Sequence, residues 1–529
     1  MRKLPIGIQS FEDIRRNGYL YVDKTEYIWK LAFAGKSYFL SRPRRFGKSL
    51  LVSAMEAYFR GRKELFCGLA AERLREQNGE PWTEYPVIRF SLSGGAYSEP
   101  DGLPDQLSNV LRKSAREYGI PDGSITGQTL PVRFRNLISA LHESAGQPVV
   151  VLVDEYDKPL LANAADNPEM EEKNREIFQS FFSILKDADD DLKFVFITGV
   201  TKFSKTSIFS DLNQMRDISL LPAYSAICGI TETELTDNFA PEIDAMAEAQ
   251  GMSEAETKAE LARMYDGYHF SKNMEGIYNP FSILNALSDQ EFGSYWFETG
   301  TPKFLYKKLM QSGRPVQEFT DGVSATEARI SNYRADDEDL VPLYYQSGYL
   351  TITGYDRRFH SFTLSYPNDE VKYGYLESLI PMVSPRYSAP DGAFSAEKMT
   401  GYLSEGDAQS FMVMLQALLA GIPYHEGKAP DNEQEWRNVI YAVFTVLGQY
   451  VHAEVHSAGG RSDCIVENEK YVYIFEFKKG KTAEEALQQI DQRGYARPYG
   501  ADARTVIKIG ASFSEEQRTL GEWRISADK

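Results

Sequence analysis

Cysteine and histidine are scarce in this sequence. Its 529 residues include three cysteines, Cys67, Cys228 and Cys464, and six histidines. The cysteines form no CxxC pair, and the histidines form no HExxH or HxH pattern. Neither a disulfide framework nor a structural zinc site is therefore indicated. We expect the three cysteines to be buried free thiols in a reducing compartment.

Long apolar runs are also missing. No stretch approaches the roughly 18 apolar residues that a membrane-spanning helix needs. The N-terminal sequence Met-Arg-Lys-Leu-Pro-Ile-Gly is not followed by such a run either. We therefore expect a soluble cytoplasmic protein with no membrane partner.

The sequence has fewer basic residues than acidic ones, 58 against 76. The net charge is −18 and the isoelectric point is about 5.0. A broad basic surface is thereby excluded, so that any contact with nucleic acid must be local. The hydrophobic share of 42% and the aromatic share of 13% are those of a folded protein. The length predicts roughly two to four domains.

Strands and helices are expected to alternate from about residue 11 to residue 220. Four mainly apolar stretches are predicted as strands, at residues 36–40, 86–92, 149–153 and 192–198. A helix is predicted from Ser49 to Arg60, where apolar residues recur at helical spacing. Apolar strands separated by helices predict an α/β fold with a parallel sheet covered on both faces. We assign residues 1–228 to this domain.

The next region, residues 229–394, is predicted to be mostly helical. Two aromatic turns with Gly or Pro interrupt it, Tyr265-Asp-Gly-Tyr-His-Phe270 and Tyr278-Asn-Pro-Phe281. The rings of the first turn have the chemistry to stack on nucleic-acid bases, but we favour core packing for them. A predicted helix and two strands follow, at residues 339–345, 349–353 and 361–365. This order resembles a winged-helix element. Residues 395–529 are predicted to form a second α/β domain.

A candidate phosphate loop lies at Arg42-Pro-Arg-Arg-Phe-Gly-Lys-Ser49, between a predicted strand and a predicted helix. It matches the pattern GxxxxGK[ST] except that Arg42 replaces the first glycine. Backbone N–H groups at a helix N-terminus bind phosphate because the helix dipole favours anions. The loop therefore predicts an ATP site. The expected contacts of the nucleotide come from Arg42, Arg44, Arg45, Phe46, Gly47, Lys48, Ser49 and Leu50.

Two acids at the end of a later strand complete this prediction. Lys48 would reach the β- and γ-phosphates, while Ser49 and Asp154 would bind Mg²⁺. Glu155 would orient or deprotonate the attacking water, and Thr198 would sense the γ-phosphate. The alternative is a chance Gly-Lys-Ser tripeptide with the two acids capping a helix. The two motifs together favour the nucleotide site.

A second candidate site lies on the predicted strand Tyr471-Val-Tyr-Ile-Phe-Glu-Phe-Lys478. Residues two apart share a face of a strand, so Glu476 and Lys478 point one way and Phe477 the other. Asp463 precedes Glu476 by 13 positions. The two acids and the Phe477 carbonyl would bind Mg²⁺ or Mn²⁺. The metal would activate a water, and Lys478 would position it or stabilise developing charge.

The chain resembles a known family over nearly its whole length. Residues from about 4 to 225 resemble the bacterial AAA-ATPase-like P-loop family, in which Arg-Pro-Arg-Arg-Phe-Gly-Lys-Ser is itself the phosphate loop. The stretches that carry this resemblance are Tyr21-Val-Asp-Lys-Thr25, Arg42-Pro-Arg-Arg-Phe-Gly-Lys-Ser-Leu50 and Phe196-Ile-Thr-Gly-Val-Thr-Lys-Phe203. Members commonly carry the two mid-chain aromatic turns and end in a domain of the PD-(D/E)XK nuclease superfamily.

The resemblance implies further residues for the second site, which would belong to a restriction-endonuclease-like α/β domain. Gly459-Gly-Arg-Ser-Asp463 is similar to a Gly-Arg-Ala-Asp motif of these nucleases. Gln489 and Tyr495, expected on the following helix, resemble their trailing Gln and Tyr. Either Glu454 or Glu435 would complete the metal shell, and we prefer Glu454. The alternative for Glu476 and Lys478 is a charged pair that protects an edge strand from aggregation.

Three functions compete. The leading hypothesis is an ATP-binding and ATP-hydrolysing protein with a metal-dependent nuclease domain that hydrolyses the phosphodiester bonds of nucleic acid, DNA in the first instance. The second is a nucleotide-dependent switch whose nuclease fold binds nucleic acid without cutting it. The third is a scaffold that binds neither ligand. Whether the chain forms a homo-oligomer is left open.

Overall fold

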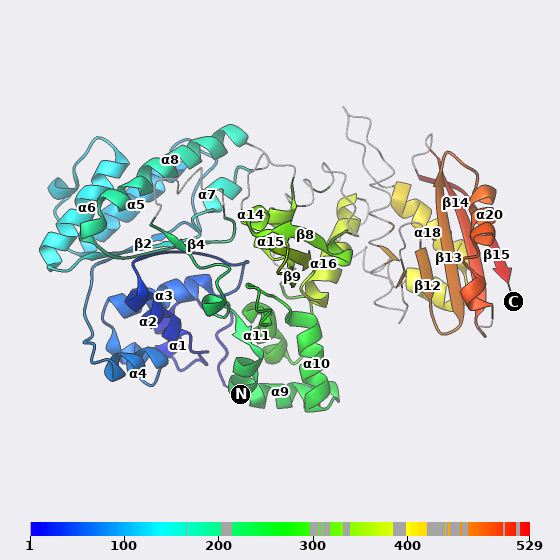
Figure 1. The fold of residues 1–529 in the computed structure, drawn as a ribbon, viewed down its shortest axis with the longest axis horizontal. Helices are drawn as coiled ribbons and strands as arrows, with labels where there is room; N and C mark the ends of the chain where they lie inside the picture. The colour runs from blue at the N-terminus through cyan, green and yellow to red at the C-terminus, as the bar shows by residue number, and fades with distance from the viewer. Residues whose placement is uncertain are drawn as a thin grey trace. The chain divides into compact units, whose positions relative to one another are not determined.

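The computed structural model describes residues 2–164, 167–202, 214–296, 305, 309, 318–331, 339–383, 398–420, 440, 443–444, 455–456, 464–500, 503–514 and 519–528. The chain divides into two compact units (Figure 1). The first unit combines Met1–Thr299 with Gly322–Glu370, and the second combines Gly300–Asp321 with Val371–Lys529. The domain boundaries after residues 228 and 394 remain a prediction.

The first unit is built on a parallel sheet, as predicted. Its strands follow the spatial order β2-β3-β4-β1-β5, and every described pair is parallel. The strands are β1 (Ser37–Ser41), β2 (Val87–Ser91), β3 (Val149–Asp154), β4 (Leu192–Gly199) and β5 (Arg216–Asp217). All six residues of β3 are buried. Such a strand needs helices on both faces of the sheet.

Aromatic side chains fix these helices to the two faces. On one face, Phe90 of β2 packs against Phe134 and Phe181, with ring centroids 5.4 and 5.6 Å away. On the other, Phe194 of β4 lies 4.7 Å from Phe59. Figure 1 shows α5, α6 and α8 on one side and α1 to α4 on the other. These helices are α1 (Phe11–Arg16), α2 (Thr25–Ala34), α3 (Lys48–Phe59), α4 (Ala70–Gln77), α5 (Gly102–Glu117), α6 (Leu130–Ala145) and α8 (Pro168–Asp187).

A helical layer follows the sheet in the chain and belongs to the same unit. It contains α9 (Glu232–Gln250), α10 (Glu254–Tyr265) and α11 (Pro280–Asp289). Capping boxes begin α9 and α10, with Thr231 and Ser253 as the N-cap residues. Asn279 caps α11 by accepting hydrogen bonds from Phe281 N and Ser282 N. The layer packs through an apolar cluster that includes Phe239, Ile243, Leu261 and Tyr265.

The predicted order of a helix followed by a hairpin is also present in this unit. Helix α15 (Val341–Ser347) precedes β9 (Thr351–Asp356) and β10 (Ser361–Ser365), and β10 also pairs with β8 (Val323–Thr326). The helix and the first strand begin two residues later than expected. Gly348, at φ 92°, ends the helix in the left-handed conformation that glycine tolerates best.

The second unit contains a mixed sheet in the order β11-β12-β13-β14-β15. Strands β13 and β14 are parallel and are joined through α20 (Ala483–Arg493), whereas the other described pairs are antiparallel. The strands are β11 (Val455–His456), β12 (Cys464–Glu467), β13 (Tyr471–Lys479), β14 (Thr505–Ser514) and β15 (Thr519–Asp528). The predicted α/β class is confirmed here too, although the sequence analysis missed β15.

The two faces of β13 alternate as expected. Val472 and Ile474 pack with Ile490 of α20. Phe475 faces the other way and lies 5.7 Å from Phe411 of α18 (Ala408–Ala420). Glu476 is therefore presented on the α20 side of the sheet.

Two expectations about the whole chain can be compared with the described residues. Cys228 and Cys464 are buried, but Cys67 is exposed, so the expectation of burial was wrong for Cys67. Among the helices that the structure describes, none combines the length and apolar character that a membrane crossing requires.

Candidate functional site

The turn from β1 into α3, which we call the Gly47 loop (residues 42–47), forms the first candidate site. Gly47 is the N-cap of α3 and has φ 86°. A residue with a side chain would be strained in this conformation. Ser49 and Leu50 lie in the first turn of α3. The first N–H groups of a helix have no partners within the helix and are suited to an anion.

The loop curls around the ammonium group of Lys48. This side chain is only 7% exposed, and its Nζ atom donates hydrogen bonds to the carbonyl oxygens of Arg42 at 2.9 Å and Pro43 at 2.8 Å. Burial lowers the pKa of Lys48, whereas the negative charges of Asp157 and Asp154 act in the opposite direction. Lys48 is therefore close enough to Asp154 and Asp157 for their charges to interact.

Asp154 is the last residue of β3, and Glu155 follows it at the same edge of the sheet. Asp154 is 2% exposed, and its Oδ1 atom accepts no hydrogen bond within the described residues. Burial, with a further contribution from Asp154, raises the pKa of Glu155, while Lys48 opposes the rise. Glu155 also has φ 54°, an uncommon conformation for a residue with a side chain. A buried carboxylate oxygen beside a helix N-terminus fits a Mg²⁺-bound phosphate.

Arg42 does not have the expected role. Its guanidinium group is buried and donates to the carbonyl oxygens of Ser41, Ser219 and Tyr224 at 2.8 to 2.9 Å. It also lies 4.2 Å from the centre of the Phe270 ring. These contacts hold Arg42 in the protein interior, so it anchors the loop instead of contacting a phosphate.

The two other arginines of the loop differ from each other. The Arg45 guanidinium stacks on the Phe281 ring at 3.6 Å, and φ at Arg45 is 67°. Arg44 is exposed, and its carbonyl oxygen accepts a hydrogen bond from Trp296 Nε1 at 3.4 Å. Arg44 is thus the arginine that is best placed to meet a ligand from solution.

Thr198 also departs from its expected role. It is fully buried, and its hydroxyl group donates to the carbonyl oxygen of Leu40 at 2.8 Å. This bond joins two neighbouring strands and leaves the hydroxyl hydrogen unavailable to a phosphate.

Asp157, whose sequence context fits either a turn cap or a ligand, organises the chain after β4. Its Oδ2 atom accepts hydrogen bonds from Val200 N at 3.0 Å and Thr201 N at 2.6 Å. The Thr201 hydroxyl group donates to the same oxygen at 2.7 Å. These bonds assign Asp157 a structural role that the sequence alone did not settle.

The mid-chain aromatic turns pack on the Gly47 loop. The Phe46 ring meets the rings of Tyr268 and Phe270 edge-on, with centroids 4.8 and 5.3 Å away. Gly229 N donates to the carbonyl oxygen of Phe46 at 3.2 Å. Tyr265 and Tyr268 are buried, so the core-packing interpretation is confirmed over base stacking.

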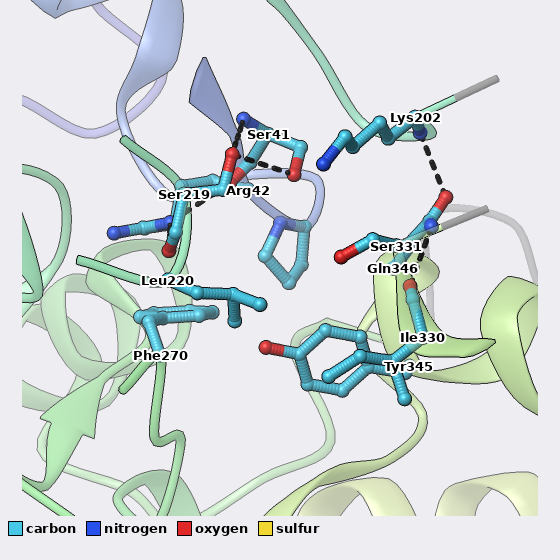
Figure 2. Close-up of a pocket in the computed structure, with 11 residues that line it drawn as sticks. Ser41, Arg42, Lys202, Ser219, Leu220, Phe270, Ile330, Ser331, Tyr345 and Gln346 are labelled. Atoms are coloured by element: carbon cyan, nitrogen blue, oxygen red, sulfur yellow. Dashed lines mark hydrogen bonds between the residues drawn. The ribbon is translucent and has the colours of Figure 1, made fainter. Parts of the chain in front are cut away.

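A small cavity lies on the Arg42 side of the loop (Figure 2). Its volume is about 20 Å³, enough for about one water molecule. Pockets for small-molecule ligands usually enclose several hundred Å³, so this cavity is not a nucleotide site. In its wall, Lys202 N donates to Gln346 Oε1 at 2.7 Å (Figure 2).

The second candidate site is centred on Glu476 of β13. The Glu476 side chain is 2% exposed, and its Oε1 atom accepts a hydrogen bond from Lys478 Nζ at 2.6 Å. Gln489 Nε2 of α20 donates to the same oxygen. Glu476 pairs with Gly510 in the adjacent strand β14. A Cβ atom at Gly510 would approach Leu487 N to 2.4 Å, so the missing side chain allows α20 to lie close to the sheet.

The expected second site lies only partly within the described residues. Tyr495 lies beyond the end of α20, which Gly494 terminates, and packs against the Val472–Ile490 cluster. The prediction that Tyr495 lies on the helix is therefore wrong. Asp463 and Glu454 lie outside the described residues, as does Glu435. Within the described ranges, no group of three or more His, Cys, Asp or Glu side chains is arranged to hold a metal ion.

Comparisons with known proteins match two parts of the chain to family models. Residues 5–209 match the family model described as a predicted AAA-ATPase, and residues 431–523 match the PD-(D/E)XK nuclease superfamily. A protein of Azotobacter chroococcum mcd 1, described as an uncharacterized protein in the vnfD 5′ region, is 36% identical over 533 residues. That alignment covers 98% of each chain. No solved structure matches the chain.

Proposed function

Because the chain belongs to the predicted AAA-ATPase family and ends in a domain of the PD-(D/E)XK nuclease superfamily, we propose that it binds and hydrolyses ATP and cleaves nucleic acid in a metal-dependent reaction. DNA is the substrate that we propose to test first. The nucleotide state of the first domain would control cleavage by the last.

The nucleotide half of the proposal rests mainly on the surroundings of Lys48. In the ligand-free loop its ammonium group is held by the Arg42 and Pro43 carbonyl oxygens. A triphosphate would offer stronger, charged acceptors and draw Lys48 towards the β- and γ-phosphates. Gly47 would let the backbone approach the phosphates, and Ser49 and Asp154 would hold Mg²⁺. Glu155 would orient the attacking water, since a carboxylate with a raised pKa is a better base.

The nuclease half rests on the convergence of Lys478 and Gln489 on one oxygen of Glu476. We propose that Glu476, Asp463 and the Phe477 carbonyl bind Mg²⁺ or Mn²⁺, with Glu454 completing the shell. Asp463 directly precedes Cys464, which pairs with Phe475 beside Glu476. When bound, the metal would supply a Lewis acid that activates water. Lys478 would then be released to stabilise the negative charge that develops on the phosphate.

The nucleotide half is tested by titrating the full chain with a fluorescent ATP analogue and Mg²⁺. Lys48→Ala should weaken binding at least tenfold. Lys30→Ala, which removes a lysine at the surface of α2, should bind like wild type. Equal affinity of Lys48→Ala and wild type would contradict the proposal.

The nuclease half is tested with supercoiled plasmid and labelled oligonucleotides, with Mg²⁺ or Mn²⁺, and with or without ATP. Lys478→Ala and Glu476→Ala should abolish cleavage, whereas Lys481→Ala, at an exposed lysine just past the strand, should not. A wild-type chain that binds DNA and never cleaves it would instead support the non-cutting switch. If the hydrogen bonds from Lys478 and Gln489 to Glu476 persist when metal is added, they would also favour the non-cutting switch, because Lys478 would not be released.

A further inference from the structure

The β9–β10 hairpin ends in an exposed turn that is held by hydrogen bonds. We call residues 357–360 the hairpin tip; all four are exposed. Asp356 Oδ1 accepts hydrogen bonds from Arg358 N at 2.7 Å and Phe359 N at 3.1 Å. His360 adopts φ 50°. Backbone bonds and a defined turn therefore fix the direction in which the side chains of the tip project.

The side chains of the tip combine charge with an apolar ring. Phe359 is 67% exposed, and among the large hydrophobic residues that the structure describes only Phe33, at 70%, is more exposed. The Arg358 guanidinium lies 5.2 Å from the centre of its ring. Neither Arg357 nor Arg358 forms an ion pair with any residue in the described ranges. The nearby acid, Asp356, uses its Oδ1 atom to accept the two backbone hydrogen bonds of the turn.

This combination is unusual for a chain with a net charge of −18. A partner that covers the Phe359 ring removes apolar surface from water, which is favourable. Two unpaired guanidinium groups beside it favour an anionic partner. A partner that offers flat apolar surfaces and regularly spaced negative charges satisfies both requirements, and unpaired nucleotides have this chemistry. An acidic protein would satisfy only the charge.

We propose that the hairpin tip binds single-stranded nucleic acid, with backbone phosphates on Arg357 and Arg358 and one base stacked on Phe359. This inference rests on the proposed action on nucleic acid, because that action identifies the partner. It adds a contact surface on the first unit, separate from the Glu476 site.

The test measures binding without cleavage. The full chain carrying Glu476→Ala is titrated in EDTA into a fluorescein-labelled single-stranded oligonucleotide, and fluorescence anisotropy gives the affinity. Arg357→Gln with Arg358→Gln should weaken binding about tenfold and reduce the slope of log K against log salt by about 1.4. Phe359→Ala should weaken binding about 5- to 150-fold. An abasic oligonucleotide of equal length should be insensitive to Phe359→Ala, since it has no base to stack.

Matched variants of the same unit serve as controls. Phe33→Ala removes another exposed phenylalanine, which is 70% exposed, and should leave the affinity unchanged. Arg62→Gln with Arg116→Gln removes two other exposed arginines and should have less effect than the hairpin variant.

Three results would overturn the inference. The first is unchanged oligonucleotide affinity in the hairpin variants, and the second is an equal effect of Phe359→Ala on the abasic strand. As a third arm, fluorescein-labelled polyglutamate is titrated in the same way. If the hairpin variants lose polyglutamate binding while their oligonucleotide binding stays intact, the partner is an acidic protein. Cleavage of plasmid by the wild-type chain, without Glu476→Ala, is scored separately, so failure of the hairpin contact is distinguishable from failure of the nuclease proposal.

Discussion

The ring of Phe46 in the Gly47 loop meets the ring of Tyr268 edge-on, at a centroid distance of 4.8 Å. About 220 residues of sequence separate the two. The loop is therefore supported from outside the parallel sheet, by a mid-chain turn that has no expected contact with nucleotide. Arg42 on Phe270 and Arg45 on Phe281 extend the same support.

Loss of the Phe46 contact should weaken nucleotide binding more than a substitution elsewhere in the core that lowers the stability by the same amount. Phe46→Leu should cost about 1–2 kcal/mol of stability and weaken binding of the ATP analogue about three- to tenfold, because the loop loses its fixed shape. Phe66→Leu is the matched control, since Phe66 is also fully buried and packs on Phe11 and Trp82 instead. Isothermal titration well below the melting temperature measures both. Equal affinities of the two variants would contradict a role of this contact in binding.

Asp154→Asn should stabilise the ligand-free protein while impairing Mg²⁺-dependent binding. The Asp154 carboxylate is buried close to Glu155, whose pKa it raises. Removal of its charge relieves this repulsion and the cost of burial. We expect these gains to exceed the lost attraction to Lys48, whose ammonium group keeps the carbonyl oxygens of Arg42 and Pro43 as acceptors. We expect an increase of about 1–3 °C in melting temperature without ligand and a loss of the further increase that MgATP gives wild type. Differential scanning fluorimetry tests this, with the exposed Asp190→Asn as the control. A lower melting temperature of Asp154→Asn without ligand would refute the electrostatic argument.

Stability should fall as pH rises from about 5 to 8 because of Glu370. Burial raises the pKa of Glu370 to about 7, although Trp296 N and the Ser282 hydroxyl group donate hydrogen bonds to its carboxylate. The folded protein therefore retains a proton there that the unfolded chain has lost near pH 4.5, and its stability decreases through this window. The loss is at most about 3 kcal/mol.

Glu370→Gln isolates this contribution, because the amide stays neutral and its oxygen can still accept a hydrogen bond. The melting temperature of this variant should depend less on pH between 5 and 8 than that of wild type. Glu12→Gln, at an exposed acid, should retain the wild-type dependence. Parallel curves for Glu370→Gln and wild type would show that Glu370 is not the responsible group.

Gln489 should affect the affinity for metal through Glu476. Its amide donates to the Glu476 oxygen that Lys478 also contacts. Loss of such an orienting contact typically weakens metal binding about 10- to 100-fold. Gln489→Ala should therefore require more Mn²⁺ for half-maximal cleavage, while saturating Mn²⁺ restores most of the rate. Gln488→Ala, at the exposed neighbour on α20, should behave like wild type. A loss of rate that metal cannot restore would indicate a role other than orientation.

Periodicity in the sequence predicted the central strands of both sheets, although β5 and β15 were missed. The strands at residues 149–153 and 471–478 were predictable because a continuous apolar run, or a pattern of side chains that repeats every two residues, directly reflects which faces of a strand are buried. Glu476 and Lys478 were placed on one face for the same reason. The end of α20 was missed because Gly494, with φ 69°, stops the helix before Tyr495.

Side-chain direction was not predictable from spacing. Arg42 occupies a position in the loop motif that suggests phosphate, but its carbonyl partners Ser219 and Tyr224 are supplied by a distant part of the chain. Thr198 similarly finds Leu40 only after β1 and β4 pair. A charged or polar residue in a motif indicates what a site could bind, whereas the hydrogen-bond partners of that residue are determined by the folded chain.

The packing of Phe46 on Tyr268 also has a consequence for the order of events during protein synthesis. The ribosome releases the Gly47 loop about 220 residues before the turn that supports it. At about 5–20 residues per second, the interval is roughly ten to forty seconds. During this time the nascent chain has its Gly-Lys-Ser motif without the aromatic support, so we expect the proposed nucleotide binding to begin only after translation has passed the middle of the chain.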